Sequence, residues 1–501
     1  MVSLVVTGLG LGITLTVCFA SKRHLLATSL FTTCRNCFVL PNQRIDLLLV
    51  FTMRRAAHLF VPLVASCCVF TSGFNTAPSL LLRTTKSSSR QSSLASTGTE
   101  IDGTAISKKI AFELHPSITD ISAESWDQCL ADDGSSSPFL EHAWLRCLEE
   151  SRCASPETGW VPQHLSILMD GEKIGYVPLY IKGHSMGEFI FDNAWAEAAY
   201  QSGISYYPKL LVGIPFTPAT GQRILLRSDV WGQFSSKEIA QLRRSVATFL
   251  RQVAESNNIS GVHFNFLTAQ EATDLSGELP EPCRDDDEEG SGKNRLQSQV
   301  QKMFSRLSNG SKNDFMRRTS LQYHWQNRNA KNDGKQYETF DDYLGCFKSK
   351  RRITIRRERR RVLEDEGIRI DAVVGDDILK YDGLVERMFE IYLSTVDKMI
   401  WGRQYLTKEF FQMLADSDFR KNLCFMCARL ESSGEELNAE DVFAGTFNIV
   451  KNGVFFGRYW GCLPGKEVKN LHFETCYWAA IDFCIKNKMK RMEPGAGGGG
   501  T

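Results

Sequence analysis

Residues able to act as acids or bases gather near the carboxyl end of the sequence. His472 and Glu474 lie at the start of a predicted helix, residues 468–486, which follows a predicted strand, residues 455–462. Either side chain could serve as a general base in a cleft at the end of that strand. The plainer interpretation is that His472 packs at the helix start and that Glu474 favours the positive end of the helix dipole.

Other side chains nearby also suit proton transfer. Tyr459 and Tyr477 could donate a proton to a leaving group, although aromatic residues of this kind more often belong to a core. Glu493 precedes a Pro-Gly turn and could orient an amine, but a solvated glutamate beside such a turn has the same pattern. His324, in the segment Gln322-Tyr323-His324-Trp325, is a second-choice base.

The densest charge lies in residues 348–361, whose spacing predicts a helix with one basic and one apolar face. Such a face suits a polyanion, either the phosphates of coenzyme A, the acceptor end of an aminoacyl-tRNA, or an anionic lipid or glycan. A solvated helix surface explains the charge equally well. No aromatic residues interleave with these cations, unlike in sites for single-stranded nucleic acid. The predicted anion-binding residues are Lys350, Arg351, Arg352, Arg356, Arg357 and Arg359.

A possible substrate groove precedes this helix in the sequence. Two segments, residues 206–209 and 215–221, combine rigid prolines with aromatic and hydroxyl groups. Each could instead be a loop packed on the core. The predicted groove residues are Tyr206, Tyr207, Lys209, Thr217, Thr220, Arg223, His324 and Trp325.

The composition limits the class of protein. A chain of 501 residues exceeds what one core usually organises, so we expect two domains with tails. The formal net charge of +1 gives no general attraction to DNA or to anionic membranes. The fifteen cysteines are scattered, which favours free thiols. Cys424 and Cys427 fall in a predicted buried strand, residues 423–428, so we expect core cysteines and no metal site.

The first hundred residues have the composition of a targeting segment. Asp46 is the only acidic residue before Glu100, and Met53 precedes an apolar run, residues 59–70, that is sized for a signal peptide. Phe74 and the basic Ser/Thr-rich stretch after it resemble a bipartite plastid presequence. Residues 2–20 are a marginal membrane span, which leaves mitochondrial and secretory alternatives open, and we expect no stable span in the mature protein.

Residues 110–278 and 315–501 are predicted to form two lobes. The acidic segment between them, residues 279–314, has too little apolar content to order itself. Alternating helices and strands in both lobes predict a layered α+β fold. The predicted helices of the first lobe are 125–130, 138–150 and 236–255, and its predicted strands are 164–170, 173–182 and 262–266.

A set of short motifs resembles a family of predicted N-acyltransferases described as peptidoglycan biosynthesis/recognition proteins, Fem-like relatives in the GNAT superfamily. The resemblance covers residues 137–495 apart from the acidic segment. In the first lobe it depends on Pro138-Phe139-Leu140, Asp192-Asn193-Ala194-Trp195, Tyr206-Tyr207-Pro208-Lys209 and Pro215-Phe216-Thr217-Pro218. In the second lobe it depends on Met316-Arg317-Arg318-Thr319, Lys350-Arg351-Arg352, Tyr405-Leu406-Thr407, Tyr459-Trp460-Gly461, Leu471-His472-Phe473-Glu474 and Glu493-Pro494-Gly495-Ala496.

The resemblance implies two GNAT-like lobes, each a mixed, mostly antiparallel sheet flanked by helices, and transfer of an acyl or aminoacyl group to an amine. It leaves the donor open between acyl-CoA and aminoacyl-tRNA. In related sequences a further segment follows the Glu-Pro-Gly-Ala motif, whereas Gly497–Gly500 and Thr501 follow it in this sequence. We therefore expect a closing strand to be missing, which keeps a second hypothesis open: a non-catalytic protein that recognises a glycan, peptide or lipid.

Overall fold

The computed structural model describes residues 99–101, 108–130, 137–277, 315–320, 322–329, 333–398 and 403–495. The predicted presequence up to residue 98, the acidic segment 279–314 and the residues from 496 onward lie outside this range. Among the described residues, no helix is both long and apolar enough to cross a membrane.

Two sheets form the first lobe, and they share a bent strand. Their orders are β1-β2-β4-β5-β8 and β3-β6-β7-β9. Pro178 separates β5 (Glu172–Val177) from β6 (Leu179–Lys182), so the prediction of one strand over residues 173–182 is wrong. Proline lacks the N–H that a continuous ladder needs. The other strands are β1 (Thr99–Ile101), β2 (Lys108–His115), β3 (Trp160–Pro162), β4 (His164–Met169), β7 (Lys209–Val212), β8 (Leu225–Leu226) and β9 (Val262–Phe264).

Of the three helices predicted for the first lobe, one is confirmed, one is broken, and the one predicted over residues 125–130 begins and ends earlier, at α2 (Ala123–Asp127). The helix predicted over residues 138–150 is broken, because Glu141 is extended between a short 3-10 turn and α3 (His142–Glu150). The predicted helix 236–255 is confirmed as α6 (Ser236–Ser256). The remaining helices are α4 (Asn193–Gln201), α5 (Ser228–Gln233) and α7 (Ala269–Ser276).

A capping box begins α6. The Ser235 side chain accepts a hydrogen bond from the backbone N–H of Glu238, and the Glu238 carboxylate accepts one from the backbone N–H of Ser235. We expect Ser235→Ala to lower the free energy of unfolding by about 1 kcal/mol, because it leaves a helix N–H without its partner. Urea unfolding measures the loss. Ser236→Ala, one residue into the helix, is the control, and equal losses for both variants would contradict the role of the cap.

The second lobe is built on one six-stranded sheet of order β10-β15-β14-β13-β12-β11. The strands are β10 (Trp325–Gln326), β11 (Ile368–Val374), β12 (Leu423–Leu430), β13 (Ala444–Lys451), β14 (Val454–Cys462) and β15 (Arg491–Glu493). The predicted strands 423–428 and 455–462 are thereby confirmed.

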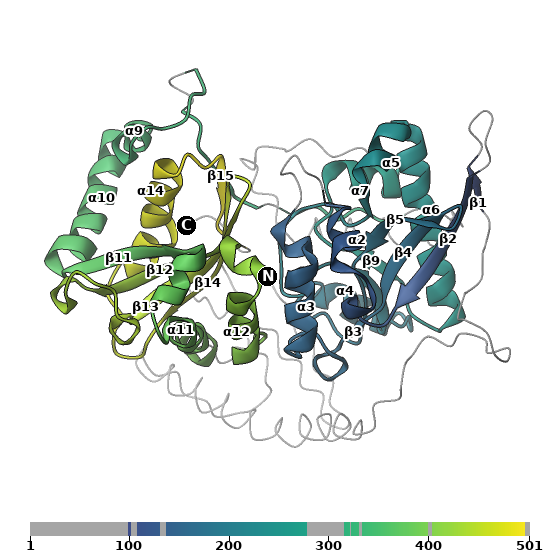
Figure 1. The fold of residues 1–501 in the computed structure, drawn as a ribbon, viewed down its shortest axis with the longest axis horizontal. Helices are drawn as coiled ribbons and strands as arrows, with labels where there is room; N and C mark the ends of the chain where they lie inside the picture. The colour runs from purple at the N-terminus through teal and green to yellow at the C-terminus, as the bar shows by residue number, and fades with distance from the viewer. Residues whose placement is uncertain are drawn as a thin grey trace, which may run out of the picture. The chain divides into compact units, whose positions relative to one another are not determined.

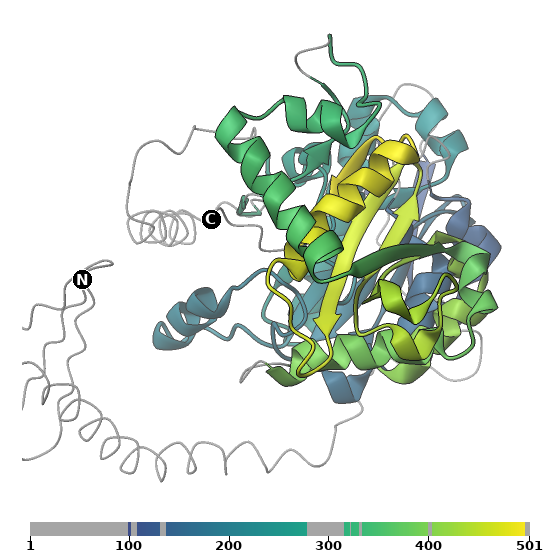
Figure 2. The ribbon, with the colours of Figure 1, turned by 90° about the vertical axis from the view of Figure 1, so that its left-hand side faces the viewer.

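Helices cover both faces of this sheet (Figures 1 and 2). One face, called the outer face below, packs against α9 (Phe340–Gly345), α10 (Ser349–Arg360) and α14 (Ala479–Lys486). The other, called the inner face, packs against α11 (Leu384–Lys398) and α12 (Lys408–Asp416). Cys424 joins the outer core and Cys427 the inner core, and both are free thiols, so the prediction of core cysteines is confirmed.

The two lobes repeat one strand arrangement. In the second lobe β11, β12, β13 and β14 are antiparallel neighbours, and β15 then pairs parallel to β14 after the α14 crossover. In the first lobe β2, β4, the bent strand β5–β6 and β7 are antiparallel, and β9 then pairs parallel to β7 after α6. The fold is therefore α+β with two mixed, mostly antiparallel units, as predicted.

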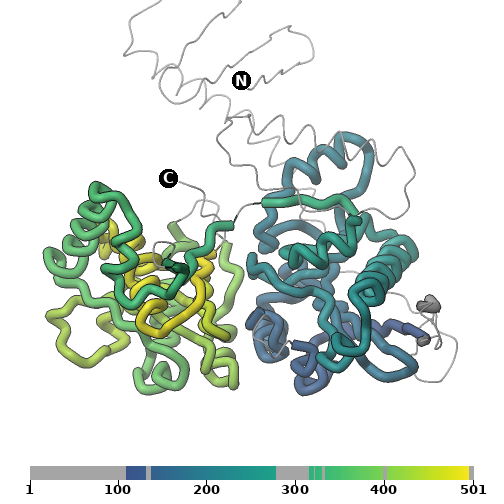
Figure 3. The backbone as a smooth tube through the Cα atoms, turned by 90° about the horizontal axis from the view of Figure 1, so that it is seen from above, coloured from purple at the N-terminus to yellow at the C-terminus, as the bar shows by residue number. Residues whose placement is uncertain are grey.

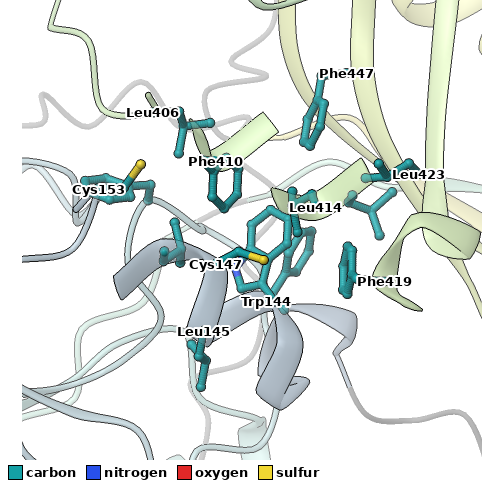
Figure 4. Close-up of a cluster of buried hydrophobic side chains, with 14 of the residues drawn as sticks. Trp144, Leu145, Cys147, Cys153, Leu406, Phe410, Leu414, Phe419, Leu423 and Phe447 are labelled. Atoms are coloured by element: carbon teal, nitrogen blue, oxygen red, sulfur yellow. The ribbon is translucent and has the colours of Figure 1, made fainter. Parts of the chain in front are cut away.

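Apolar side chains join the two lobes (Figure 4). Trp144 of α3 packs edge-on against Phe410 of α12, with ring centroids 5.2 Å apart, and lies 5.2 Å from the Phe419 ring. The segment 315–329 also connects them, because Phe315 packs against Phe264 while Trp325 pairs with Met492 (Figure 3). These contacts hold the two lobes together.

Candidate active site

The five predicted catalytic residues lie on opposite faces of the second-lobe sheet. His472, Glu474 and Tyr477 belong to the outer face, where the His472 ring packs 5.4 Å from Trp460 and Glu474 pairs with Arg359 of α10. Their helix begins at Leu471 rather than at residue 468 and continues through a π-helical turn, Glu474–Trp478, into α14.

Tyr459 and Glu493 belong to the inner face. The Tyr459 ring packs 5.0 Å from Tyr392 of α11. Because side chains alternate along a strand and Met492 lies in the outer core, Glu493 points to the inner face. These two residues therefore share a site from which Glu474 is separated by the sheet.

Unpaired buried polar atoms gather on this inner face. The hydroxyl of Tyr459, Nε of Arg458, Oε2 of Glu493 and Nε2 of His324 are all buried and make no hydrogen bond of ordinary geometry, although Arg458 and Tyr459 lie close enough for each to shift the pKa of the other. Glu493 is 3% exposed; its Oε1 accepts from Arg491 at 2.7 Å, and its Oε2 lies 3.8 Å from His324 Nε2, too far for a hydrogen bond. We call His324, Arg458, Tyr459 and Glu493 the inner-face cluster. Buried polar atoms in native proteins are nearly always paired, so this cluster is suited to a ligand.

A strained loop of the first lobe meets the cluster. Phe216 has a left-handed backbone with φ of 56°, which is costly for an aromatic residue, and its carbonyl oxygen accepts a hydrogen bond from Arg458. The Phe216 ring stacks on Tyr405 of the second lobe with centroids 5.1 Å apart. Strain of this kind concentrates at functional sites, and the loop fixes the direction in which the Arg458 guanidinium points.

Burial sets the protonation states in the cluster. Removal from water raises the pKa of the Tyr459 phenol, so the hydroxyl keeps its proton and can donate it. Burial also lowers the pKa of the Arg458 guanidinium from its ordinary 12.5. Two donors, Tyr459 and Arg458, therefore face an acceptor, Glu493.

The sequence analysis did not name Arg458, and it named Phe216 only as part of the Pro215-Phe216-Thr217-Pro218 motif. Arg458 directly precedes the Tyr459-Trp460-Gly461 motif, and an arginine within a predicted strand of mostly apolar residues is the signal that could have revealed it. The left-handed backbone of Phe216 has no sequence signature, because a phenylalanine seldom adopts it.

Glu474 has unusual electrostatics although it lies outside the cluster. Its side chain is 1% exposed and receives one hydrogen bond, from Arg359 at 3.1 Å. Burial raises the pKa of this carboxyl from 4.5 to about 7, and Arg359 opposes the rise. A folded-state pKa above the unfolded value means that this group's contribution to stability is present below pH 4.5 and is lost as the pH rises through about 7.

Glu474→Gln should therefore flatten the pH dependence of stability. The amide keeps a hydrogen-bond acceptor for Arg359 and has no proton to lose. We therefore expect the free energy of unfolding of the variant to rise relative to that of the wild type by about 1.4 kcal/mol for each pH unit between pH 4.5 and about 7. Thermal unfolding of both proteins at pH 5 and pH 8 measures the difference. Parallel pH profiles for the two proteins would contradict the raised pKa.

The predicted basic helix is confirmed as α10, and several of its cations have local partners. Arg352 donates to the carbonyl oxygen of Phe347, Arg356 pairs with Asp341, and Arg359 pairs with Glu474. The exposed cations include Lys350, Arg351, Arg356 and Arg357. Whether they bind an anion stays a prediction.

Lys209 does not line a groove, contrary to the prediction. It is fully buried, and its ammonium donates to Ser185, Glu188 and Asp192 at 2.7 to 3.0 Å. Tyr206 donates to Asp192 and Tyr207 bonds to Ser185, so both tyrosines belong to the same network. This network ties the loop before α4 to β7.

Among the other predicted groove residues, some are buried inside their own lobe and others are exposed. Arg223 is fully buried and bonded to the carbonyl oxygens of Asn265, Gln222 and Ala219, so it holds its loop together and cannot line a groove. Thr217 is buried beside the strained Phe216 and Thr220 is exposed. Trp325 packs on the outer face against Tyr337, whereas His324 joins the inner-face cluster. The prediction that Trp325 lines a substrate groove with His324 is therefore wrong.

Solved structures with related folds have low sequence identity to this chain. FemX is 11% identical, with coverage of 75% of this chain and 88% of FemX and a TM-score of 0.35. A tandem GNAT protein from the clavulanic acid biosynthesis pathway is 9% identical, with coverage of 77% and 89% and a TM-score of 0.32. L-PGS from Bacillus licheniformis is 8% identical, with coverage of 57% and 61% and a TM-score of 0.30, so the match spans less than two thirds of that protein. No curated protein matches the sequence.

The chain also matches a known protein family over most of its length. Residues 117–281 and 293–500 match the FemAB-like family, which is described as peptidoglycan biosynthesis/recognition. The matched ranges include both lobes and every member of the inner-face cluster. The resemblance drawn from the sequence motifs is thus confirmed, and the chain belongs to the FemAB-like family.

Proposed function

We propose that the inner-face cluster transfers an acyl or aminoacyl group from an activated donor to an amine. The observation that carries the proposal is the set of unpaired buried atoms on Arg458, Tyr459, Glu493 and His324. Acyl transfer to an amine needs an acceptor for the amine proton, donors for the developing oxyanion and a proton for the leaving group, and this cluster has one group for each requirement.

The roles follow from the chemistry of each group. Glu493 Oε2 accepts a hydrogen bond from the amine and takes its proton as the nitrogen attacks the carbonyl carbon. Arg458 Nε donates to the oxygen that becomes negative. When the new C–N bond has formed and the bond to the donor breaks, the Tyr459 hydroxyl gives its proton to the leaving thiolate or alkoxide. His324, 3.8 Å from Glu493, helps to orient the amine.

The donor in this proposal is acyl-CoA or aminoacyl-tRNA, and the acceptor is a small-molecule or peptide amine. Family membership supports a peptidoglycan-like peptide among the acceptors to be tested. The plastid is the proposed location, as expected from the amino-terminal composition.

Product detection tests the proposal. The full-length protein is incubated with an amine-bearing peptide and with acetyl-CoA, a longer acyl-CoA or an aminoacyl-tRNA in turn, and N-acylated peptide is measured by mass spectrometry. We expect product with one donor class. Binding of the peptide without product from any donor would reject transfer and favour a recognition protein.

A further inference from the structure

A short segment of the second lobe, Tyr405-Leu406-Thr407, is bonded to the first lobe. The Thr407 N–H donates a hydrogen bond to Sγ of Cys153 at 3.2 Å, and the Thr407 hydroxyl donates to the carbonyl oxygen of Ser151 at 3.2 Å. Leu406 lies with Cys153 in the apolar core between the lobes (Figure 4). We call residues 405–407 the bridge segment. Its carboxyl end is thus fixed against the first lobe.

A tyrosine of α11 holds the other end of the bridge segment. The hydroxyl oxygen of Tyr392 accepts hydrogen bonds from the backbone N–H groups of Tyr405 at 3.0 Å and Leu406 at 3.2 Å. The Tyr392 ring is buried and packs edge-on against Tyr459, with centroids 5.0 Å apart. Backbone N–H groups away from water need an acceptor, and one phenol oxygen serves two of them here. Tyr392 therefore joins the bridge segment to the inner-face cluster.

The Tyr405 ring packs on two strained phenylalanines of the first lobe. It stacks on Phe216 with centroids 5.1 Å apart and planes 24° from parallel, and the Phe189 ring lies edge-on at 6.1 Å. Both phenylalanines have left-handed backbones, with φ of 56° and 57°. Residues in such conformations persist only when their surroundings hold them there. The Tyr405 ring contacts both of them, so it is one of the groups that maintain this loop.

The same loop controls the direction of an arginine in the inner-face cluster. The carbonyl oxygen of Phe216 accepts a hydrogen bond from Arg458. The Arg458 guanidinium also lies over the Phe139 ring at 5.1 Å and over the Tyr459 ring at 5.5 Å. Ring faces attract a cation without a directed hydrogen bond. The hydrogen bond to Phe216 therefore sets the direction in which Nε of Arg458 points.

We propose that Tyr392 and Tyr405 are positioning residues of the transfer reaction, which act through Phe216 to direct Nε of Arg458 at the oxygen that becomes negative. The inference rests on the proposed function, in which Arg458 donates to that oxygen. A donor stabilises a developing charge most when its direction is set before the reaction. The bridge segment thus gives the contact between the lobes a part in the chemical step.

Steady-state transfer kinetics of full-length variants test the inference. We expect Tyr405→Ala and Tyr392→Phe to lower kcat about 10- to 100-fold with little change in KM, because the guanidinium loses its direction while substrate binding is kept. Tyr392→Phe retains the ring against Tyr459 and removes only the acceptor of the two N–H groups. Tyr405→Phe retains the stack on Phe216 and should keep the wild-type kcat.

The matched controls come from the first lobe. The hydroxyl of buried Tyr176 bonds to Ser125 at 2.5 Å, and Phe249 stacks on Phe112 with centroids 4.6 Å apart. Tyr176→Phe and Phe249→Ala should lower stability and keep the wild-type kcat where the protein is folded. A purely structural role of Tyr405 would give Tyr405→Ala the same behaviour and would overturn the inference.

A double-mutant cycle tests whether Tyr405 acts through Arg458. Arg458→Lys keeps the positive charge and removes the directed Nε–H. In that background we expect Tyr405→Ala to change kcat by less than about twofold, because the group that it positions is already lost. Losses that multiply in the double variant would contradict the inference, as would equal losses for Tyr405→Ala and Tyr405→Phe.

A measurement without turnover separates this inference from the proposed function. In protein with isotope-labelled arginine, the NMR signal of the Arg458 Nε–H is identified by its absence from Arg458→Lys. We expect hydrogen exchange at this group to be about tenfold faster in Tyr405→Ala and Tyr392→Phe, with no change in the controls. Unchanged exchange in both variants would refute the positioning even in a protein that transfers. Faster exchange in a protein that yields no product with any donor would reject the proposed function alone.

Discussion

Glu493→Gln is expected to reduce kcat for transfer about 100- to 10,000-fold, because the amide cannot take the proton of the attacking amine. The substitution preserves the size of the side chain and an oxygen for the bond to Arg491. We therefore expect the variant to fold and to bind the donor as the wild type does. Single-turnover measurement with the active donor class separates this loss in the chemical step from a loss in binding.

Glu474→Gln is the matched control for Glu493. Both carboxylates are buried and each pairs with one arginine, but Glu474 lies on the opposite face of the sheet. We expect Glu474→Gln to change kcat by less than about tenfold. The reverse result, a large loss for Glu474→Gln and little change for Glu493→Gln, would move the active site to the outer face.

Trp144→Ala is expected to cost about 3 to 5 kcal/mol of stability, because it leaves a cavity between the lobes. The indole is 2% exposed and contacts rings from α12 and from the turn after it (Figure 4). We also expect kcat to fall at temperatures where the variant is folded, since Trp144 packs against Phe139 and the Arg458 guanidinium lies over the Phe139 ring. Chemical denaturation and transfer assays measure the two effects.

The control for Trp144 is another buried tryptophan of the first lobe. Trp126 stacks on Tyr176 and lies within that lobe. Trp126→Ala should cost a similar amount of stability while leaving kcat unchanged in the folded protein. A Trp144→Ala variant with wild-type kcat would show that lobe packing does not position the site.

Much of the fold follows from local sequence patterns. The continuous apolar run 423–428 predicted β12, the segment 455–462 predicted β14, and the helix predicted over residues 236–255 is α6. The exceptions have local physical causes. Pro178 divides one predicted strand between two sheets, and Asn470, with φ of 72°, delays the helix that carries Glu474.

The site was harder to predict because it depends on which face of a strand each side chain occupies. Tyr459 and Glu493 were both named from the sequence, but their pairing with His324 and Arg458 results from strand pairing between distant segments. His472 and Glu474 are close to Tyr459 in sequence, and the sheet nevertheless separates them. Sequence proximity could not distinguish the two groups.

The two lobes repeat one strand arrangement, but they differ in the side chains at the end of the parallel strand of each lobe. At the end of β9 in the first lobe, the Arg223 guanidinium is bonded to the carbonyl oxygen of Asn265, whereas at the end of β15 in the second lobe Glu493 keeps an unpaired oxygen. We therefore expect a substitution of Arg223 to lower the stability of the protein, and, under the proposed mechanism, a substitution of Glu493 to lower turnover in a protein of normal stability.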